Sequence, residues 1–429
     1  MKLNKITACA AVLAMCAALT ACGNTAEPEE TTAAEVSSEQ TTVPPVVIDD
    51  VNSTTAAPTE PVDLDAGLTD AMYERGLINE GDTSRLAAAM KKAQNGEDIT
   101  VAVIGGSITQ GTAASNNALC YGSLFFRWWQ EKFPECNVNT VNAGIGGTNS
   151  YLGVNRVDDQ VLSYNPDVVV VEFSVNDTDK VLNKYSYDSL VRKILSYESN
   201  PAVILLFTTQ EDGTSLQETH KEIGTAYDLP MLSYREVVYP EVAAGTLDWK
   251  AISPDNIHPN DAGHGLIGQL LGRYLDGIYD ELDSISSEVT PFTADGYTKD
   301  YYKNAKMYFP STLETQLDGF EVGSNTVYPD KFPENWVTEN GGTISFEADF
   351  QTLGMFYLKT TDGKGGKYEI YVDGERQKTI DSDFSGGWGN YGATDSVAIN
   401  QTSEHHSVEI KPAEGSESTS MTILGIMMS

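Results

Sequence analysis

Two patterns of hydrophobic and polar positions divide the chain near residue 283. Before it, apolar runs rich in β-branched residues alternate with segments whose apolar positions recur at helical spacing. Strands that are apolar along their length, separated by helices, predict a parallel sheet covered on both faces. We expect strands at 101–104, 137–141, 166–173, 202–207 and 229–232. We expect helices at 83–96, 121–133, 151–164, 187–197, 215–227 and 261–282.

After residue 283 the pattern changes to short apolar stretches without helices between them. The expected strands are 343–348, 354–359, 367–372, 396–400, 406–410 and 421–426. Asp373-Gly374 is typical of a tight hairpin turn. Successive strands of this kind predict an all-β sandwich of the jelly-roll type, which begins between residues 283 and 335.

The amino terminus has the features of an export signal. Two lysines precede an apolar run at 6–19, which is too short to span a bilayer. The run ends in LTACG at 19–23, which resembles the lipobox of bacterial lipoproteins, where cleavage leaves an acylated cysteine at the new amino terminus. We expect Cys22 to carry acyl chains that anchor the protein to a membrane. An ordinary cleaved signal is the alternative.

Domain boundaries follow from these patterns. Residues 1–22 form the expected lipoprotein signal, and residues 23–66 are rich in Thr, Glu, Ala, Pro and Ser, a composition that predicts a disordered tether. The expected α/β domain spans 67–282 and the β-sandwich 283–429. An anchored and tethered chain of this kind would lie on the extracellular face of the cell membrane.

The net charge of the chain excludes some classes of partner. The formal net charge is -35, which argues against nucleic acids and anionic membrane surfaces but not against a neutral sugar polymer.

Once the signal is removed and Cys22 acylated, Cys120 and Cys136 remain. The predicted helix between them would hold them about 20 Å apart at 1.5 Å per residue, too far for a disulfide. We expect two free, mostly buried thiols.

Candidate chemistry begins at the sequence VAVIGGSITQG at 101–111. A buried strand there ends in two glycines, where the backbone turns sharply, and Ser107 follows at the turn. The hydroxyl therefore lies at the carboxyl end of a strand, where open α/β sheets place their chemistry. A Ser/Gly turn without chemistry would have the same local pattern.

Three further loops lie at the same edge of the predicted sheet and can supply what a serine nucleophile needs. Asp255 and His258 are three residues apart, so the carboxylate can hold the imidazole tautomer that accepts the Ser107 proton. An attacked carbonyl also needs donors for its oxyanion. The backbone N–H groups of Ser107 and Gly147 and the side-chain amide of Asn176 are the candidates.

Four short sequences carry a resemblance to a known family. They are GGSIT at 105–109, NAGIGG at 142–147, VND at 175–177 and DNIHPN at 255–260. In order and spacing they resemble the four blocks of the SGNH (GDSL-type) hydrolases, over roughly residues 100–282. The resemblance implies a flavodoxin-like three-layer α/β/α fold, Ser107 as nucleophile with Asp255 and His258, and Gly147 and Asn176 in the oxyanion hole. One departure is Gly106, where the family usually has Asp.

Other sites fit the sequence less well. GSITQG at 106–111 has the glycine spacing of a phosphate loop, but Thr112 stands where the lysine is needed. GIGGTN at 144–149 lacks the third glycine of a dinucleotide fingerprint. We expect no metal and no cofactor, including at the pair 405–406. His220 and His264 are expected to be surface or packing residues, and the pair 128–129 to be core tryptophans.

The expected activity is that of a serine esterase that removes acyl groups, with acetyl favoured, from xylan-like or other polysaccharides. An exported and anchored enzyme with an appended β-sandwich suits an extracellular polymer. The Gly-rich loop at 385–392 carries Trp388 and Tyr391, as sugar-binding surfaces do, although a packed loop would explain them equally well. The alternatives are a lipase- or thioesterase-type hydrolase of the same family, and an inactive surface protein that binds carbohydrate.

Overall fold

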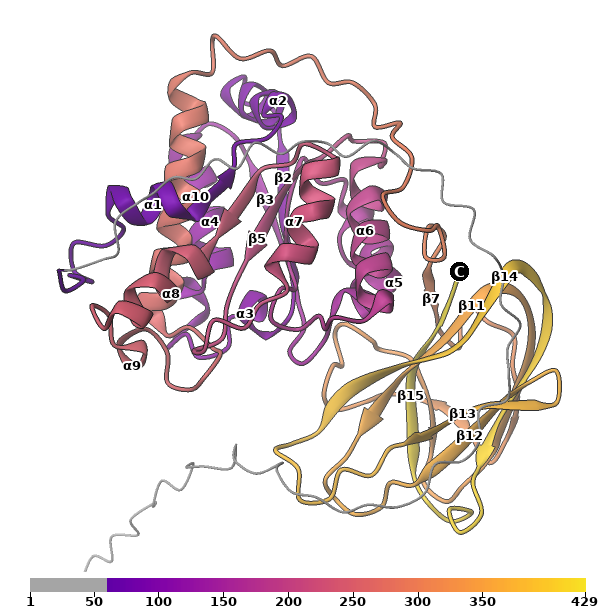
Figure 1. The fold of residues 1–429 in the computed structure, drawn as a ribbon. Coiled ribbons are helices and arrows are strands. Elements are labelled where there is room, and N and C mark those ends of the chain that lie inside the picture. The colour runs from indigo at the N-terminus through magenta and orange to yellow at the C-terminus, as the bar shows by residue number, and fades with distance from the viewer. Residues whose placement is uncertain (1–59) are drawn as a thin grey trace, which may run out of the picture. The chain divides into compact units, whose positions relative to one another are not determined.

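The computed structural model describes residues 60–429, and Figure 1 shows its ribbon. The expected signal, Cys22 and nearly all of the expected tether lie outside the described residues. The described residues all belong to one compact unit. Within residues 60–429, no helix is long and apolar enough to cross a membrane.

The first half contains a six-stranded sheet with the order β1-β6-β5-β4-β2-β3. Its parallel strands are β2 (Ile99–Gly105), β3 (Val138–Gly144), β4 (Val168–Glu172), β5 (Ala202–Phe207) and β6 (Met231–Ser233). The short β1 (Leu77–Asn79) pairs antiparallel with β6. Taken in chain order, the five parallel strands have the flavodoxin-like arrangement 2-1-3-4-5, which confirms the predicted fold class.

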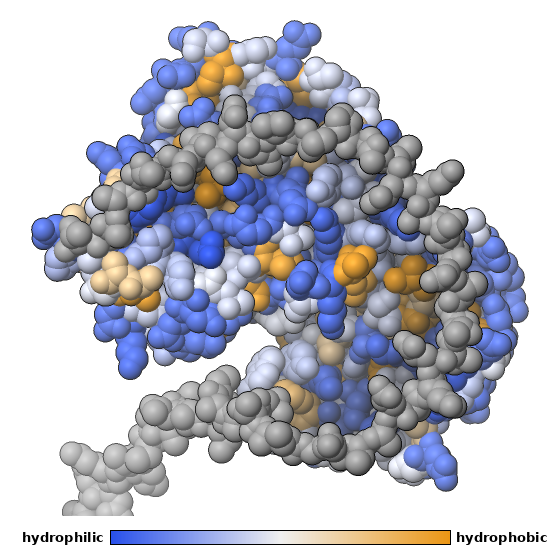
Figure 2. All heavy atoms as spheres, in the orientation of Figure 1, coloured by the Kyte–Doolittle hydropathy of each residue, from blue (hydrophilic) through white to orange (hydrophobic). Residues whose placement is uncertain are grey.

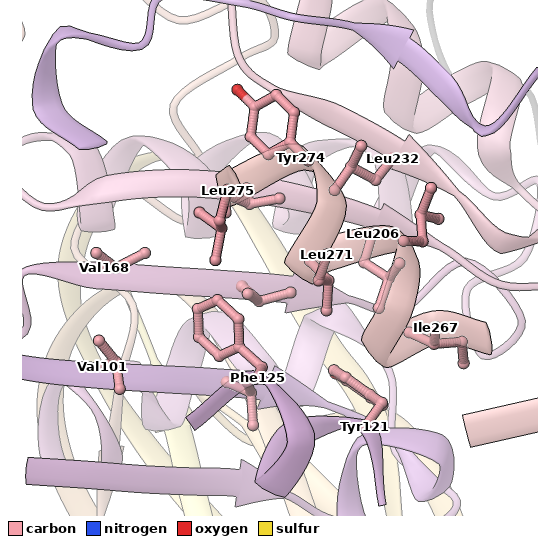
Figure 3. Packing of buried hydrophobic residues seen from close by; sticks show 14 of the residues in the cluster. Val101, Tyr121, Phe125, Val168, Leu206, Leu232, Ile267, Leu271, Tyr274 and Leu275 are labelled. Carbon is pink, nitrogen blue, oxygen red and sulfur yellow. The ribbon is translucent and has the colours of Figure 1, made fainter. Parts of the chain in front are cut away.

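Helices cover both faces of this sheet, as Figure 1 shows. They are α1 (Asp70–Gly76), α2 (Ser84–Gln94), α3 (Ser107–Gln110), α4 (Tyr121–Lys132), α5 (Ser150–Gln160), α6 (Val181–Leu195), α7 (Gln217–Ala226), α8 (Tyr234–Ala244), α9 (Trp249–Ile252) and α10 (Asp261–Asp280). Alternate residues of each strand face opposite layers. Val101 and Val103 of β2 join the core cluster that includes α2, α4 and α10, which Figure 3 shows from close by. Ala102 and Ile104 join the cluster that includes α5 and α6.

In the first half of the chain, the sequence pattern missed five α-helices and strands and misplaced some boundaries. The missed elements are α1, β1, α3, α8 and α9. Four of them have seven residues or fewer, too few for a clear period, and α8 contains Pro240. Helix α6 begins at Val181, six residues before the expected start at 187. In the described part of the chain Cys120 and Cys136 are free, as predicted, with Cys120 buried and Cys136 partly exposed.

The second half is an all-antiparallel β domain, which also confirms the predicted fold class. Its sheet follows the path β13-β12-β14-β11-β15-β10-β9, with β7 on β15 and β8 on β11. The strands are β7 (Lys306–Tyr308), β8 (Gln316–Asp318), β9 (Glu321–Gly323), β10 (Asn335–Thr338), β11 (Thr343–Lys359), β12 (Lys367–Val372), β13 (Glu375–Asp381), β14 (Tyr391–Pro412) and β15 (Met421–Met428).

Two corrections concern the longest strands of this domain. The expected pair 343–348 and 354–359 is one strand, β11, and the expected pair 396–400 and 406–410 is one strand, β14. Their mutual register shifts between Phe350 and Thr352, so the pairing continues through a bulge that interrupts the apolar pattern. The hairpin at Asp373-Gly374 is confirmed: both residues have positive φ, +52° and +79°, and they join β12 to the polar β13, which the pattern missed.

The β domain shares a hydrophobic cluster with the α5 and α6 face of the first sheet. Phe332, Phe356 and Leu424 belong to the same buried cluster as Tyr151 and Val154 of α5. A separate cluster, which includes Trp336, Phe350 and Tyr368, forms the domain's own core. The shared cluster holds the β domain against the layer that carries part of the candidate site.

Candidate active site

The turn after β2 holds Ser107 at the carboxyl edge of the sheet. Ser107 is the first residue of the short helix α3, and its residue surface is 8% exposed. A Cβ placed on Gly105 would lie 2.1 Å from Oγ1 of Thr109 and 2.4 Å from the carbonyl oxygen of Glu172. Only glycine fits this tightly packed turn. The turn therefore fixes the direction in which the Ser107 hydroxyl points.

Ser107, His258 and Asp255 form a continuous chain of hydrogen bonds. His258 Nε2 lies 2.9 Å from Ser107 Oγ, and His258 Nδ1 lies 2.8 Å from Asp255 Oδ2. The second carboxylate oxygen, Oδ1, accepts the backbone N–H groups of Ile257 and His258 at 2.8 and 2.7 Å. These bonds fix the carboxylate, and the carboxylate in turn orients the imidazole.

The protonation of this chain of residues follows from its contacts. Burial raises the pKa of the Asp255 carboxyl, but the backbone N–H and ring of His258 and the N–H of Ile257 outweigh burial, so the pKa lies below its ordinary value. A charged Asp255 accepts a hydrogen bond from the Nδ1–H group of the His258 ring. Nε2 is then the acceptor that faces the Ser107 hydroxyl, the geometry that general-base activation of a serine requires.

Gly147 and Asn176 lie on the two loops beside Ser107. Gly147 has φ +72°, in the left-handed region where a side chain is strained, and it precedes α5, whose amino terminus Asn149 caps. Asn176 follows β4 and packs directly on Gly106. A Cβ on Gly106 would lie 2.1 Å from Asn176 Oδ1. The absence of a side chain at 106, the departure from the family pattern, therefore makes room for Asn176.

Comparisons with known proteins place the chain in a family. Residues 103–266 match the model of the GDSL-like lipase/acylhydrolase family. The crystal structure of a two-domain esterase (CEX) active on acetylated mannans is 32% identical, covers 83% of this chain and 98% of its own, and superposes with a TM-score of 0.78. The chain belongs to the GDSL-like lipase/acylhydrolase family.

A second crystal structure of that esterase, co-crystallised with mannopentaose, gives nearly the same values: 32% identity, 83% and 97% coverage, and a TM-score of 0.77. The match extends over both halves, so this acylhydrolase shares the arrangement of an α/β domain followed by an antiparallel β domain. A search of curated protein sequences finds no match to the chain.

The possible sugar contacts, Trp388 and Tyr391, lie near the loop of the candidate site that carries Gly147. A Cβ placed on Gly147 would lie 3.9 Å from Cδ2 of Tyr391. Trp388 stacks on Tyr391 with ring centroids 4.9 Å apart and is 74% exposed. Phe384 contacts both rings edge-on. An exposed aromatic surface of the β domain thus borders the loop that carries Gly147.

Two buried ionisable side chains support the strand ends, and the sequence analysis did not single them out. Arg156 of α5 donates to the carbonyl oxygens of Ala143 and Gly105, at the ends of β3 and β2, and burial lowers its pKa to about 9. Glu172, the last residue of β4, accepts from the hydroxyls of Thr109 and Thr208. Burial raises the pKa of Glu172 to about 7.

The remaining histidines have other partners. His264 lies three residues after Asp261, as His258 does after Asp255, but Asp261 accepts from the backbone of Ser115 instead. His264 is buried between the backbone N–H of Tyr121 and the carbonyl of Thr112, and burial lowers its pKa to about 4. Spacing alone therefore does not distinguish the two histidines.

His405 and His406 both lie within β14. His405 pairs with Asp349 and His406 with Asp373. Within residues 60–429, no group of three or more His, Cys, Asp or Glu side chains is arranged to hold a metal ion. Of the paired tryptophans, Trp129 is fully buried and Trp128 packs on the same core, as predicted.

Proposed function

We propose that this acylhydrolase is a serine esterase that removes acetyl groups from polysaccharides through an acyl-enzyme. The observation that carries the proposal is the hydrogen-bonded series from Ser107 through His258 to Asp255. It lies at the sheet edge beside Gly106, on which the Asn176 amide packs. This arrangement supports the proposal because acyl transfer requires a nucleophile, its base and oxyanion donors close together.

In the acylation step, His258 Nε2 takes the proton of Ser107 as Oγ bonds to the acetyl carbonyl carbon. The oxyanion that forms is stabilised by the N–H groups of Ser107 and Gly147 and by the Asn176 amide. Asp255 stabilises the imidazolium. The C–O bond to the sugar then breaks, and the leaving sugar oxygen takes the proton from His258.

The acetyl group on Ser107 is removed by the same residues in reverse roles. His258 accepts a proton from a water molecule, whose oxygen attacks the acetyl carbonyl. The same oxyanion donors act again, and collapse of the intermediate releases acetate as Ser107 Oγ recovers its proton from His258.

Acetylated mannan-like or xylan-like polysaccharide is the substrate class we propose. The related two-domain esterase is described as active on acetylated mannans and was co-crystallised with mannopentaose. In the present chain the exposed Trp388 and the adjacent Tyr391 offer a flat apolar surface, on which the face of a sugar ring can pack. On the visible part of the face shown in Figure 2, apolar side chains form small separate groups.

We propose further that the protein is exported and held by lipid chains on Cys22 at the outer face of the cell membrane. The support is the sequence at 1–23, with its lysines, apolar run and lipobox-like end. Cys22→Ala should move the full-length protein from the membrane fraction to the soluble fraction. Unchanged membrane association in this variant would contradict the anchor.

Acetate release from acetylated mannan and acetylated xylan tests the activity. The wild-type enzyme should release acetate, and Ser107→Ala should reduce the rate to the background of a heat-treated sample. Comparing p-nitrophenyl acetate with the octanoate tests acyl length, and we expect a steep fall in kcat/KM. Equal or faster hydrolysis of the octanoate would favour a lipase, and binding without hydrolysis would favour an inactive carbohydrate-binding protein.

A further inference from the structure

Asp177, the residue after Asn176, has a fully buried carboxylate that accepts three hydrogen bonds. Its Oδ1 accepts the backbone N–H of Ser150 at 2.8 Å and the side-chain amide of Asn183 at 3.2 Å. Its Oδ2 lies 3.0 Å from His220 Nε2, and the side chains of Asp177 and His220 are both 0% exposed. Three donors converge on one group, so only an acceptor satisfies them.

His220 is held so that its direction toward Asp177 is fixed. It lies on α7, and its ring stacks on Tyr187 of α6 with centroids 3.6 Å apart and an interplanar angle of 2°. Within the described residues, His220 Nδ1 is buried without a hydrogen-bond partner. The ring therefore has one polar contact, the one with Asp177, and Nε2 must carry the proton that makes it.

The two proposed oxyanion loops meet at this carboxylate. Ser150 begins α5, and its N–H ties the loop that carries Gly147 to Asp177. Asn176 precedes Asp177, and the backbone N–H groups of both residues donate to the carbonyl of Phe173. Within residues 60–429, Asn176 Oδ1 is buried without a hydrogen-bond partner. The amide therefore depends on packing against Gly106 and on the backbone beside it.

We propose that Asp177 and His220 are positioning residues that set the spacing between the Asn176 amide and the Gly147 loop. The backbone of Asp177 belongs to the loop that carries Asn176. Its carboxylate accepts the Ser150 N–H and so holds the loop that carries Gly147. His220 holds the carboxylate in place. This inference rests on the proposed esterase function, in which Gly147 and Asn176 stabilise the oxyanion. Neither side chain touches substrate in this proposal.

Asp177→Asn tests the carboxylate, because an amide nitrogen would face one of the three donors. We expect kcat for p-nitrophenyl acetate to fall about 100-fold with KM nearly unchanged, since one lost oxyanion donor typically costs 100- to 1,000-fold. In an Asn176→Ala background the same change should cost about tenfold or less, because the amide to be positioned is gone. Equal losses in the two backgrounds would indicate a general structural role and overturn the proposal.

Two further pairs of variants test the Ser150 contact and the His220 contact of Asp177 separately. Ser150→Pro removes the N–H at the first position of α5, which accepts proline, and Ser150→Ala removes only the hydroxyl. We expect the proline variant to have at least a tenfold lower kcat than the alanine variant. His220→Gln keeps a side-chain N–H donor and should retain severalfold more kcat than His220→Leu. Equal kcat values within each pair would contradict the positioning role.

Asp373→Asn is the matched control. Asp373 lies in the β domain and also accepts from a histidine ring, His406 Nδ1 at 2.7 Å, and from a backbone N–H, that of Ser407 at 2.9 Å. This variant should retain wild-type kcat. Full activity of Ser107→Ala would refute the proposed function itself, whereas an inactive Ser107→Ala combined with a fully active Asp177→Asn would refute this inference alone.

Discussion

Residues 60–429 contain two histidine–aspartate pairs beside the same sheet edge, and they differ in exposure. The side chains of His258 and Asp255 are 22% and 46% exposed, and His258 Nε2 faces the Ser107 hydroxyl. The side chains of His220 and Asp177 are both 0% exposed, and His220 Nε2 faces only Asp177. In the pair of His258 and Asp255, Nε2 lies beside the Ser107 hydroxyl, so this pair can move a proton to and from substrate. The enclosed pair can act only by holding backbone in place.

A third pair, His406 and Asp373 in the β domain, sharpens this comparison. Its bond of 2.7 Å is as short as that of the pair at Ser107, and the second ring nitrogen lies 3.0 Å from the Asn400 amide. Both nitrogens of this ring are thus occupied by polar partners other than a hydroxyl nucleophile. A short bond between His and Asp is therefore not evidence of catalysis without the third group.

The largest expected effect comes from removing the exposed ring. His258→Ala should lower kcat by at least about 10⁴-fold, as loss of the base does in other serine hydrolases, because His258 Nε2 is the group that faces the Ser107 proton. His406→Ala removes a ring from the third pair and should leave kcat within about twofold. Steady-state hydrolysis of p-nitrophenyl acetate checks both variants. A His258→Ala enzyme that retained a tenth of the activity would contradict the role of His258 as the base.

The next effect concerns Gly106, which separates the nucleophile turn from Asn176. Gly106→Ala places a methyl group 2.1 Å from the Asn176 amide oxygen, so the amide must move. We expect kcat to fall about 100- to 1,000-fold, the cost of one oxyanion donor. Gly277→Ala in α10 is the control, since a Cβ there meets nothing within 4 Å. Undiminished kcat in Gly106→Ala would show that the position of the Asn176 amide does not matter for catalysis.

His264 provides a pH-dependent test of the contrast between buried and exposed histidines. Burial lowers its pKa from 6.5 to about 4, so the folded state favours the neutral ring. The contribution of neutral His264 to the free energy of unfolding is complete above pH 6.5. It is lost as the pH falls from 6.5 toward 4, because the ring gains a proton in the unfolded state first. Between pH 7 and pH 5 this loss amounts to about 2 kcal/mol.

Urea unfolding of wild type and His264→Gln at both pH values checks this prediction. The comparison with the variant is necessary because Glu172, whose pKa burial raises to about 7, contributes in the opposite direction. Its stabilisation is present at low pH and is lost as the pH rises through 7. The free energy of unfolding of His264→Gln should therefore fall by about 2 kcal/mol less than that of wild type. Identical pH dependence in the two proteins would contradict a neutral, buried His264.

The positions of the parallel strands along the chain and of the four polar loops could be predicted from the sequence because both are local patterns. Val101 to Ile104 are apolar at every position, and the chemistry follows within a few residues of the strand end. The continuity of β11 and β14 could not be predicted in this way. The bulge near Phe350 breaks the apolar pattern, whereas backbone pairing between the strands continues through it.

The supporting contacts of the site were beyond sequence analysis because they join distant segments. Asp177 and His220 are 43 positions apart, and nothing in either local sequence indicates that α7 turns His220 toward the loop after β4. The reason for glycine at 106 likewise lies at Asn176. The equal spacing of Asp255 to His258 and of Asp261 to His264 shows the limit most clearly, since only the packing around each ring separates their roles.

The smallest expected effect lies outside both histidine pairs, at the aromatic surface beside Gly147. Trp388→Ala should raise KM for acetylated mannan about tenfold, which corresponds to about 1.4 kcal/mol of lost stacking. It should leave kcat/KM for p-nitrophenyl acetate within about twofold, because that small ester needs only the residues around Ser107. Tyr297→Ala, which removes another exposed ring, is the control and should change neither value. Equal losses on both substrates would mean that Trp388 supports the Gly147 loop through Tyr391 rather than binding sugar.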